Sequence, residues 1–217
     1  GHGPFSHTLE FSLFKDVKHE QITLWTLKKL NRHFSGRLDM AIEIFEGIYP
    51  RKFLTQLVSS QLDTDRLDYL KRDSFFNGVQ EGTIGAERII KMLSVHNEEL
   101  VVEEKALYSI ESFLSARRIM YWQVYLHKTA ISAERMLIEI IKRAKRLTQS
   151  GQKIEATPAL RIFLERDITM RDFAEDPDLV EIFMALDDTD VWGSIKFWAE
   201  HEDPVLSTLS KMLLERK

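Results

Sequence analysis

Histidines and acidic residues gather at the start of the chain, which opens GHGPFSH. His2 and His7 flank a Gly-Pro pair, and Glu10 follows three positions after His7. If a helix begins at Pro4, His7 and Glu10 share one face, and His2 lies in the loop before it. Loop amides at a helix start favour anions, and an imidazole can transfer a proton near neutral pH. These residues, with His19 further along, indicate either a phosphate-binding acid–base site or scattered surface histidines beside a tag remnant.

A second group of reactive residues lies in DTDRLDYLKRD, residues 63–73. At helical spacing Asp65, Tyr69 and Asp73 fall on one face, with Arg66 nearby. Two carboxylates, a phenol and a guanidinium could bind a metal ion and a polyol. The alternative is a solvated charged face on which one aspartate caps the helix.

A third group lies in SARRIMYWQVYLHK, residues 115–128. Arg117, Tyr121 and Tyr125 recur every fourth residue, so that a cation and two phenols share one helix face. A guanidinium beside phenols could hold a phosphate and hydrogen-bond a sugar. The alternative is an aromatic stripe in the core or in a subunit interface.

The composition excludes several classes of function. The 217 residues are 44% hydrophobic and 29% charged, and the net charge of −4 gives no basic field for nucleic acid or anionic membrane. The chain has no cysteine, so a metal must bind His, Asp, Glu or water. No apolar run is long enough for a membrane span, and we expect a cytoplasmic protein without nucleic-acid or membrane partners.

The elements that must position these residues are mostly helices, because glycine and proline are scarce and apolar residues recur at spacings of three and four. Isoleucine and valine flank His96-Asn97-Glu98-Glu99 and predict a β-hairpin near residues 87–105. The fold class is therefore mainly α, with a partial domain at 1–150 and a helical appendage at 151–217. The predicted helices cover residues 4–14, 19–34, 38–47, 54–62, 63–76 and 106–148, the last as one helix or two.

The three groups together resemble HD-domain phosphohydrolases, in the branch of deoxynucleoside triphosphate triphosphohydrolases that includes the SAM-and-HD-domain enzyme. GHGPFSH resembles the segment that follows the paired His-Asp of this family. SSQLDTDRLDYLKRDS (59–74) resembles the segment with the last metal-binding aspartate, and RRIMYWQVYLHKT (117–129) resembles the substrate-contacting helix. The match covers roughly residues 1–150 and implies an HD-domain helical bundle, whereas 151–217 carry no recognisable motif.

The resemblance implies roles for the residues of the first two groups. Asp65 matches the metal-ligating aspartate. His2 and His7 match histidines that face the phosphates. Glu10 stands where the family has an acidic partner of the catalytic histidine, and His19 matches the histidine of a following His-Glu pair.

The resemblance also implies a substrate pocket. Arg66 and Arg117 match residues that bind the phosphates. Tyr69 and Asp73 match the pair that holds the sugar 3′-hydroxyl, and Tyr125 matches a tyrosine that packs against the sugar.

The metal site of the family also uses an upstream histidine and the His-Asp pair, and only Asp65 of that set is present here. We therefore expect a fragment that lacks its N-terminal helices, is inactive alone and binds the divalent ion weakly or not at all. That ion could be Mg, Mn, Fe, Co or Zn. The parent would hydrolyse a deoxynucleoside triphosphate to deoxynucleoside and tripolyphosphate.

Two alternative functions stay open. The chain could belong to an HD phosphohydrolase that acts on another nucleotide or phosphate ester. It could also be a non-catalytic, nucleotide-binding oligomeric module. In every case we expect a homo-oligomer, dimer or tetramer, because the long helix with Trp122 and the segments around Trp192 and Trp198 carry more apolar surface than a small bundle buries.

Overall fold

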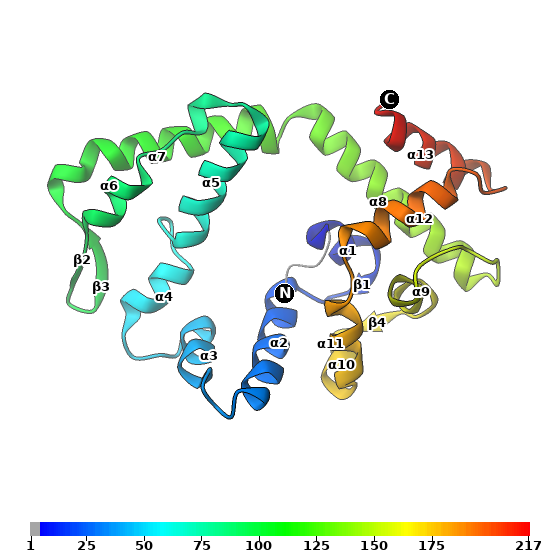
Figure 1. The fold of residues 1–217 in the computed structure, drawn as a ribbon, viewed down its shortest axis with the longest axis horizontal. Helices are drawn as coiled ribbons and strands as arrows, with labels where there is room; N and C mark the ends of the chain where they lie inside the picture. Colours follow the sequence, from blue (N-terminus) through cyan, green and yellow to red (C-terminus); the bar gives the residue numbers. More distant parts are fainter. Residues whose placement is uncertain (1–4) are drawn as a thin grey trace. The chain divides into compact units, whose positions relative to one another are not determined.

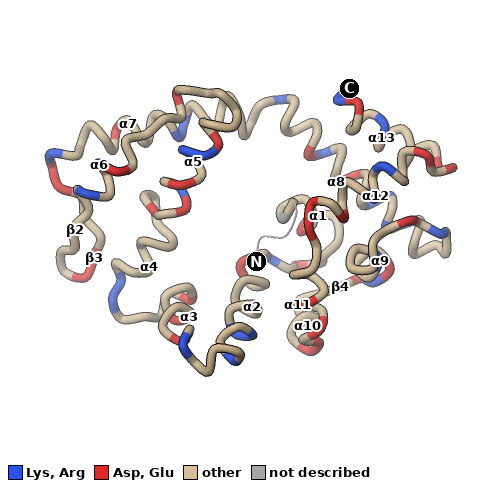
Figure 2. Tube along the Cα trace, in the orientation of Figure 1, with Lys and Arg blue, Asp and Glu red and all other residues tan. Residues whose placement is uncertain are grey.

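The computed structural model describes residues 5–217, for Ser6 and Lys15 the backbone alone, and its chain is mainly α-helical (Figure 1). This confirms the fold class. The predicted catalytic residue His2 lies outside the described residues. Basic and acidic residues both occur throughout the chain (Figure 2). Among the described residues, no helix combines the length and apolarity needed to cross a bilayer.

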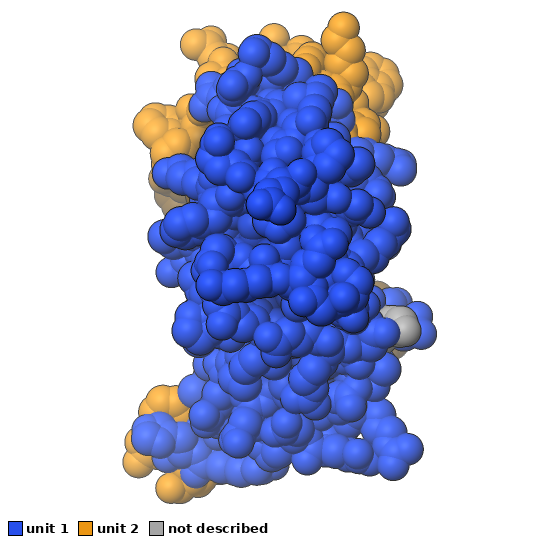
Figure 3. Space-filling model, turned by 90° about the vertical axis from the view of Figure 1, so that its right-hand side faces the viewer, with its two compact units in different colours: residues 1–33, 132–217 blue, residues 34–131 orange. Residues whose placement is uncertain are grey.

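The chain divides into two compact units, coloured separately in Figure 3. Unit 1 comprises residues 1–33 and 132–217, and unit 2 comprises residues 34–131, so unit 2 is inserted into the sequence of unit 1. The domain division expected at Ser150-Gly151 stays a prediction. The compact units divide elsewhere, because residues 151–217 pack in the same unit as the first helices.

Unit 1 contains most of the helices and one parallel strand pair. Part of its core is aromatic, since Phe14, Phe163, Phe173 and Phe183 contact one another with ring centroids 5.5–6.3 Å apart. Its elements are α1 (Ser6–Ser12), β1 (Phe14–Lys15), α2 (His19–His33), most of α8 (Lys128–Gln149), α9 (Pro158–Glu165), β4 (Ile168–Thr169), α10 (Met170–Glu175), α11 (Pro177–Met184), α12 (Asp188–Trp198) and α13 (Pro204–Glu215).

The predicted first helix ends earlier than expected. α1 stops at Ser12, and Phe14 pairs with Ile168 in the parallel β1–β4 ladder. Phe14 and Ile168 are both buried, so pairing across more than 150 residues of sequence removes two large side chains from water. Local spacing could not show this competing tertiary contact.

The C-terminal helices follow the turn signals of the sequence. Pro158, Pro177 and Pro204 each occupy the first helical position, where a missing N–H costs nothing. Aspartates cap α11, α12 and α13, and their carboxylates accept from free backbone N–H groups. The short helices of residues 158–215 are thereby set locally.

Unit 2 is a smaller helical unit with one hairpin. Its core is a cluster of seven buried side chains: Leu67, Leu70, Ile84, Ile89, Phe113, Ala116 and Met120. Its elements are α3 (Asp39–Glu46), α4 (Lys52–Val58), α5 (Thr64–Asn77), η1 (Gln80–Gly82), α6 (Ala86–Lys91), β2 (Leu93–His96), β3 (Glu99–Val102), η2 (Glu104–Ala106), α7 (Leu107–Met120) and η3 (Tyr121–Tyr125).

The predicted hairpin is confirmed over its central part. β2 and β3 are antiparallel, and Asn97 and Glu98 have φ values of 50° and 64°, as a two-residue type I′ turn requires. Residues 86–91 are instead the helix α6. This apolar segment forms a helix and not a strand because the helix places Ile89 in the core of unit 2, where it is fully buried.

The long helical stretch of residues 106–148 consists of two helices with a π-helical segment between them. α7 ends at Met120, and in η3 the N–H of Leu126 donates to the Tyr121 carbonyl at 2.7 Å. Such π turns are rare and occur often at functional sites. This one carries Tyr125, which was predicted to bind the substrate, and Tyr121, which was predicted to share its helix face.

Candidate functional site

The first predicted group forms a compact cluster within unit 1. α1 presents His7 and Glu10 one turn apart, and α2 begins with His19. The Glu10 carboxylate lies between the two imidazoles: Oε1 is 2.7 Å from His19 Nδ1, and Oε2 is 3.4 Å from His7 Nδ1. Oε1 also accepts the backbone N–H of His19 at 2.5 Å. The two rings meet edge to face with centroids 5.1 Å apart.

The environment of Glu10 keeps its carboxylate ionised at neutral pH. Burial raises the pKa of Glu10, but hydrogen bonds from the His19 backbone and ring, with a smaller contribution from His7, outweigh it and leave the pKa below its ordinary value. The side chains of Glu10 and His19 are 16% and 17% exposed, whereas His7 is 61% exposed. His7 is thus the member open to a ligand, and Glu10 and His19 form the protected side of the cluster.

His7, Glu10 and His19 could in principle also hold a metal, because one ligand atom from each lies within 4.8 Å of the others. Two imidazoles and a carboxylate suit a borderline divalent ion. However, His19 Nδ1 and Glu10 Oε1 already lie at hydrogen-bond distance. An ion bound by both would have to break that bond, so the geometry fits an acid–base cluster better than a metal site.

A mostly apolar pocket of about 500 Å³ opens beside His7. Its wall includes Phe5 and Trp192, whose rings meet edge to face at 5.8 Å, together with Leu137 of α8. His7 therefore lies between the Glu10 carboxylate and this mostly apolar pocket. Within unit 1 this arrangement places a proton-carrying group next to space for a ligand.

The second predicted group lies on α5 in unit 2. Asp63, not Asp65, caps the helix, because its Oδ1 accepts the Arg66 N–H at 2.8 Å. This leaves Asp65 exposed in the first turn, with no hydrogen bond or ion pair among the described residues. Asp65 is therefore available as a ligand, but as a single carboxylate.

The side chain of Arg66 is turned back toward the start of its own helix. Its Nη1 donates to the Ser60 carbonyl at 2.8 Å and forms an ion pair with Asp63, while its Nε is buried without a partner among the described groups. The predicted phosphate contact of Arg66 stays a prediction. In this state its Nη1 serves the start of the helix.

Tyr69, Asp73 and Tyr125 come together as predicted from the sequence. The Tyr125 hydroxyl donates to Asp73 Oδ2 at 2.6 Å, and the rings of Tyr69 and Tyr125 meet edge to face at 6.0 Å. Burial and the neighbouring Asp73 carboxylate raise the pKa of Tyr125 above its ordinary value, and burial raises that of Tyr69. Both phenols therefore stay protonated and can donate hydrogen bonds at neutral pH.

Arg117 lies beside this cluster and contacts Gln61 and Tyr121. The sequence assigned neither of these residues a role in positioning Arg117. Its Nη1 donates to Gln61 Oε1 at 2.9 Å, and its guanidinium carbon lies 5.8 Å from the centroid of the Tyr121 ring. Tyr121 in turn contacts Tyr125, with centroids 5.1 Å apart. The fourfold spacing revealed the Arg117–Tyr121–Tyr125 face, but no sequence signal pointed to Gln61.

The predicted site residues thus fall into two groups, each assembled within its own unit. His7, Glu10 and His19 meet in unit 1, and Tyr69, Asp73, Arg117 and Tyr125 gather in unit 2 with Tyr121. That both groups serve one substrate stays a prediction.

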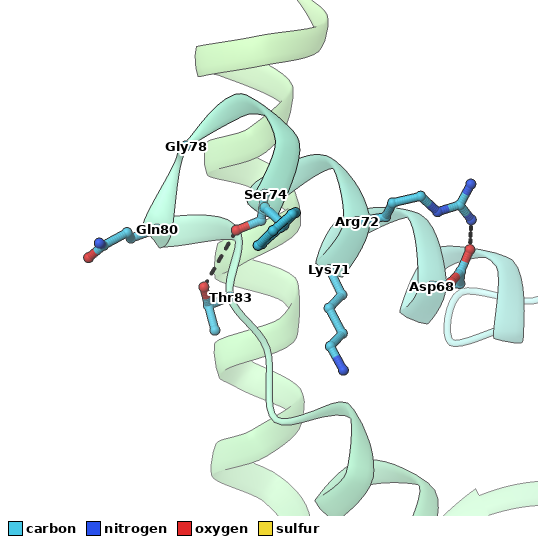
Figure 4. Close-up of a pocket in the computed structure, with 8 residues that line it drawn as sticks. Asp68, Lys71, Arg72, Ser74, Gly78, Gln80 and Thr83 are labelled. Carbon is cyan, nitrogen blue, oxygen red and sulfur yellow. Dashed lines mark hydrogen bonds and ion pairs between the residues drawn. The ribbon is translucent and has the colours of Figure 1, made fainter.

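Another pocket in unit 2, of about 660 Å³, contains none of the predicted site residues. It lies along α5 and the following turn. Figure 4 shows Lys71 extending alone, Arg72 turned toward Asp68, and the Ser74 hydroxyl facing Thr83. Because Asp65, Tyr69 and Asp73 are not part of its wall, this pocket is separate from the candidate site.

Comparisons with known proteins relate the chain to HD-domain proteins. Residues 84–171 match a family described as the HD associated region. The whole chain is 30% identical to an uncharacterized protein, YwfO, of Bacillus subtilis (strain 168), and covers 49% of that protein. It is also 24% identical, over 71% of the chain and 33% of the relative, to a Dictyostelium discoideum protein named as a deoxynucleoside triphosphate triphosphohydrolase SAMHD1 homolog.

Solved structures give a similar picture. A phosphohydrolase from Bacteroides thetaiotaomicron superimposes with a TM-score of 0.96 and 54% identity, over 99% of this chain and 53% of the other. A hypothetical protein from Aquifex aeolicus has the same fold, with a TM-score of 0.70 and 24% identity over the whole chain and 53% of the other. The chain therefore spans about half the length of YwfO and of both solved structures.

Proposed function

We propose that this chain is part of an HD-superfamily phosphohydrolase that hydrolyses deoxynucleoside triphosphates to deoxynucleoside and tripolyphosphate. The observation that carries the proposal is the Glu10 carboxylate held between the imidazoles of His7 and His19, at 3.4 and 2.7 Å. The similarity to a phosphohydrolase and to HD-domain proteins supports the reaction class. The triphosphohydrolase reaction rests on the sequence resemblance and on the tyrosine–aspartate cluster of unit 2.

Within the cluster, Glu10 and His19 prepare His7 to move a proton. The ionised Glu10 carboxylate accepts from both imidazoles and stabilises positive charge on them. Because His7 is the exposed member, it is the group we expect to protonate the leaving oxygen of the substrate. Glu10 is a positioning residue in this scheme, and so is His19, which fixes the orientation of the carboxylate.

Asp65 is the residue of this chain that would hold the divalent metal. When bound, such an ion lowers the pKa of a water toward neutrality and supplies a nucleophile. A single exposed carboxylate does not hold a divalent ion against water. We therefore propose that the remaining ligands come from a longer protein, of the length of the relatives, and that these 217 residues alone do not turn over substrate.

The cluster of unit 2 would bind the substrate. The protonated Tyr69 and the Asp73 carboxylate offer a donor and an acceptor to a sugar 3′-hydroxyl, and Tyr125 packs beside them. Arg117, and Arg66 once released from Asp63, would neutralise the phosphates. A site built to hydrogen-bond a hydroxyl rejects analogues that lack it far better than shape alone does.

The test gives the longer parent protein dGTP with Mg²⁺ or Mn²⁺ and follows the products by ³¹P NMR. We expect tripolyphosphate, and we expect Asp65→Asn to lose activity by about a hundredfold or more. Asp68→Asn is the matched control on the same helix and should keep activity near that of the wild type. Pyrophosphate with a nucleoside monophosphate would contradict the triphosphohydrolase reaction.

A second candidate is a nucleotide-binding module without catalysis. It is favoured by one observation: Asp65 is the only metal ligand of the family that this sequence carries. It predicts that the parent binds dGTP through Arg117 and Tyr125 and releases no phosphate product with any divalent ion. A phosphohydrolase for another ester would bind dGTP weakly and cleave a competing substrate, such as a nucleoside monophosphate or a cyclic dinucleotide.

We also propose that the protein is a homo-oligomer. Tyr108, Leu114 and Trp122 are exposed at 82%, 49% and 65% along α7 and η3, which leaves a large apolar surface in contact with water. Light scattering coupled to gel filtration should give a mass of at least twice 25.4 kDa. A monomer at micromolar concentration would contradict this proposal.

A further inference from the structure

A small pocket of unit 1, apart from the residues assigned above, has three cations in its wall beside Ser12, Leu13 and Phe14. It has a volume of about 260 Å³ and lies between the end of α1, β1 and the second half of α8. Lys142, Lys145 and Arg146 line it, together with Gln149 and Asp167. Lys145 and Arg146 follow Lys142 by three and four positions, so each is a neighbour of Lys142 on the surface of α8.

Lys145 is the unusual member because it is buried, with only 8% of its surface exposed. Its Nζ donates to the Leu13 carbonyl at 2.6 Å and lies 3.1 Å from Asp167 Oδ1. An ammonium group has three donors, and these two contacts leave one of them for the pocket. An oxyanion in the pocket could accept a charge-assisted hydrogen bond from this third donor.

The other charges at the pocket leave an excess of positive charge. Arg146 is exposed and forms no ion pair or hydrogen bond with another described side chain. Lys142 lies 3.4 Å from Glu139, a surface pair of little strength. Among the described residues of the wall, Asp167 is the one carboxylate; its side chain is 48% exposed and also accepts from Gln149 at 3.1 Å.

We propose that this pocket binds a compact phosphoryl anion, either inorganic phosphate or the terminal phosphate of a polyphosphate. Three cations face one carboxylate, and multiply charged oxyanions accept charge-assisted hydrogen bonds from several donors at once. The volume lies below the range of about 300–1,000 Å³ that is usual for drug-sized ligands, which suits a small anion better than a whole nucleotide. This site does not depend on the function proposed above.

Occupancy of the pocket would also stabilise the end of α1. Leu13 follows α1 directly, and α1 carries His7 and Glu10. An anion bound to Lys145 and Arg146 would fix the position of the Lys145 ammonium, which donates to the Leu13 carbonyl. Binding should therefore raise the thermal stability of unit 1 in this chain, without any metal or substrate.

The test measures binding of inorganic phosphate, tripolyphosphate and dGTP to the 217-residue chain by calorimetry, with sodium chloride at matched ionic strength as the reference. We expect phosphate or tripolyphosphate to bind and to raise Tm, and Arg146→Gln and Lys142→Gln each to weaken binding by about tenfold. Arg135→Gln is the matched control, since it removes the same charge from an exposed position of α8 outside the pocket. It should bind like the wild type.

The outcomes separate the sources of the anion and can overturn the proposal. If Arg135→Gln and Arg146→Gln weakened phosphate binding equally, the effect would be a general one of ions and not of a site. The same conclusion would follow if sodium chloride raised the Tm as much as phosphate does. Binding of dGTP that is lost in Tyr125→Phe and kept in Arg146→Gln would belong to unit 2. Lys145→Met, checked for folding by circular dichroism, should abolish phosphate binding; unchanged binding in that variant would also overturn the proposal.

Discussion

At the scale of single residues, the chemistry of this chain depends on which polar groups have partners. Glu10 is held by two imidazoles and a backbone N–H, whereas Asp65 has no partner among the described residues. The sequence correctly predicted that His7 and Glu10 are neighbours, because residues three apart on a helix lie on the same face. The contact from Glu10 to His19 depends on the turn between α1 and α2, which spacing alone does not fix.

Glu10→Gln tests the acid–base cluster. The amide cannot stabilise imidazolium charge as the carboxylate does, so we expect kcat of the parent protein to fall by about 10²-fold or more. Glu20→Gln is the matched control, because Glu20 is exposed and lies 3.4 Å from the other ring nitrogen of His19. Similar losses in both variants would contradict a specific role for Glu10.

Tyr125→Phe removes the hydroxyl that donates to Asp73 at 2.6 Å. We expect the free energy of unfolding to fall by about 1 kcal/mol, since one partly buried hydrogen bond is lost and the ring is kept. Urea denaturation of this chain measures the change. Tyr49→Phe, between α3 and α4, is the control, because the Tyr49 hydroxyl has no hydrogen bond among the described residues, and this variant should change nothing.

At the scale of elements, the close approach of η1 to α7 requires a glycine. A Cβ on Gly82 would lie 2.5 Å from Met120 Sδ and 2.9 Å from Ser74 Cβ, and both neighbours are buried. Gly82→Ala should destabilise unit 2 by about 1–3 kcal/mol because α5, η1 and α7 must move apart. Gly85→Ala meets nothing within 4 Å and should be close to neutral in the same denaturation experiment.

The start of α13 predicts a pH dependence. Asp203 caps this helix, and its hydrogen bond with Arg143 of α8 lowers the pKa of Asp203 to about 2. A carboxyl group whose pKa is lowered by folding stabilises the protein above its ordinary pKa, and that stability is lost as the pH falls. Asp203→Asn should therefore cost about 1 kcal/mol at pH 7, through the weakened cap and the lost ion pair.

The difference between wild type and Asp203→Asn should be constant above about pH 4 and shrink between about pH 4 and 2. Denaturant midpoints across this range measure it. Asp188→Asn, at an exposed position in the first turn of α12, is the control and should show a smaller dependence. A difference that grows as the pH falls would contradict the assignment.

At the scale of the whole molecule, the described residues form two hydrophobic cores, one in each compact unit. Phe163→Ala removes a fully buried ring from the aromatic core of unit 1 and should cost about 3–5 kcal/mol. Hydrogen exchange should then speed up in α9 and α12 and stay near wild type in α5 and α7. Equal acceleration in all four helices would mean that the two units unfold as one.

The sequence by itself determined the mainly helical class, the presence of a hairpin near residues 87–105, and the faces that carry His7 with Glu10, Tyr69 with Asp73, and Arg117 with Tyr125. Helical and strand periodicity are local properties, so residues a few positions apart can be placed without knowing the rest of the chain. Only the tertiary structure decided that Phe14 leaves α1 to pair with Ile168, that Gln61 holds Arg117, and that Lys145 is buried under the Leu13 carbonyl. Each of these contacts joins residues 56 or more positions apart, and burial between such distant segments overrides local preference in ways that spacing does not record.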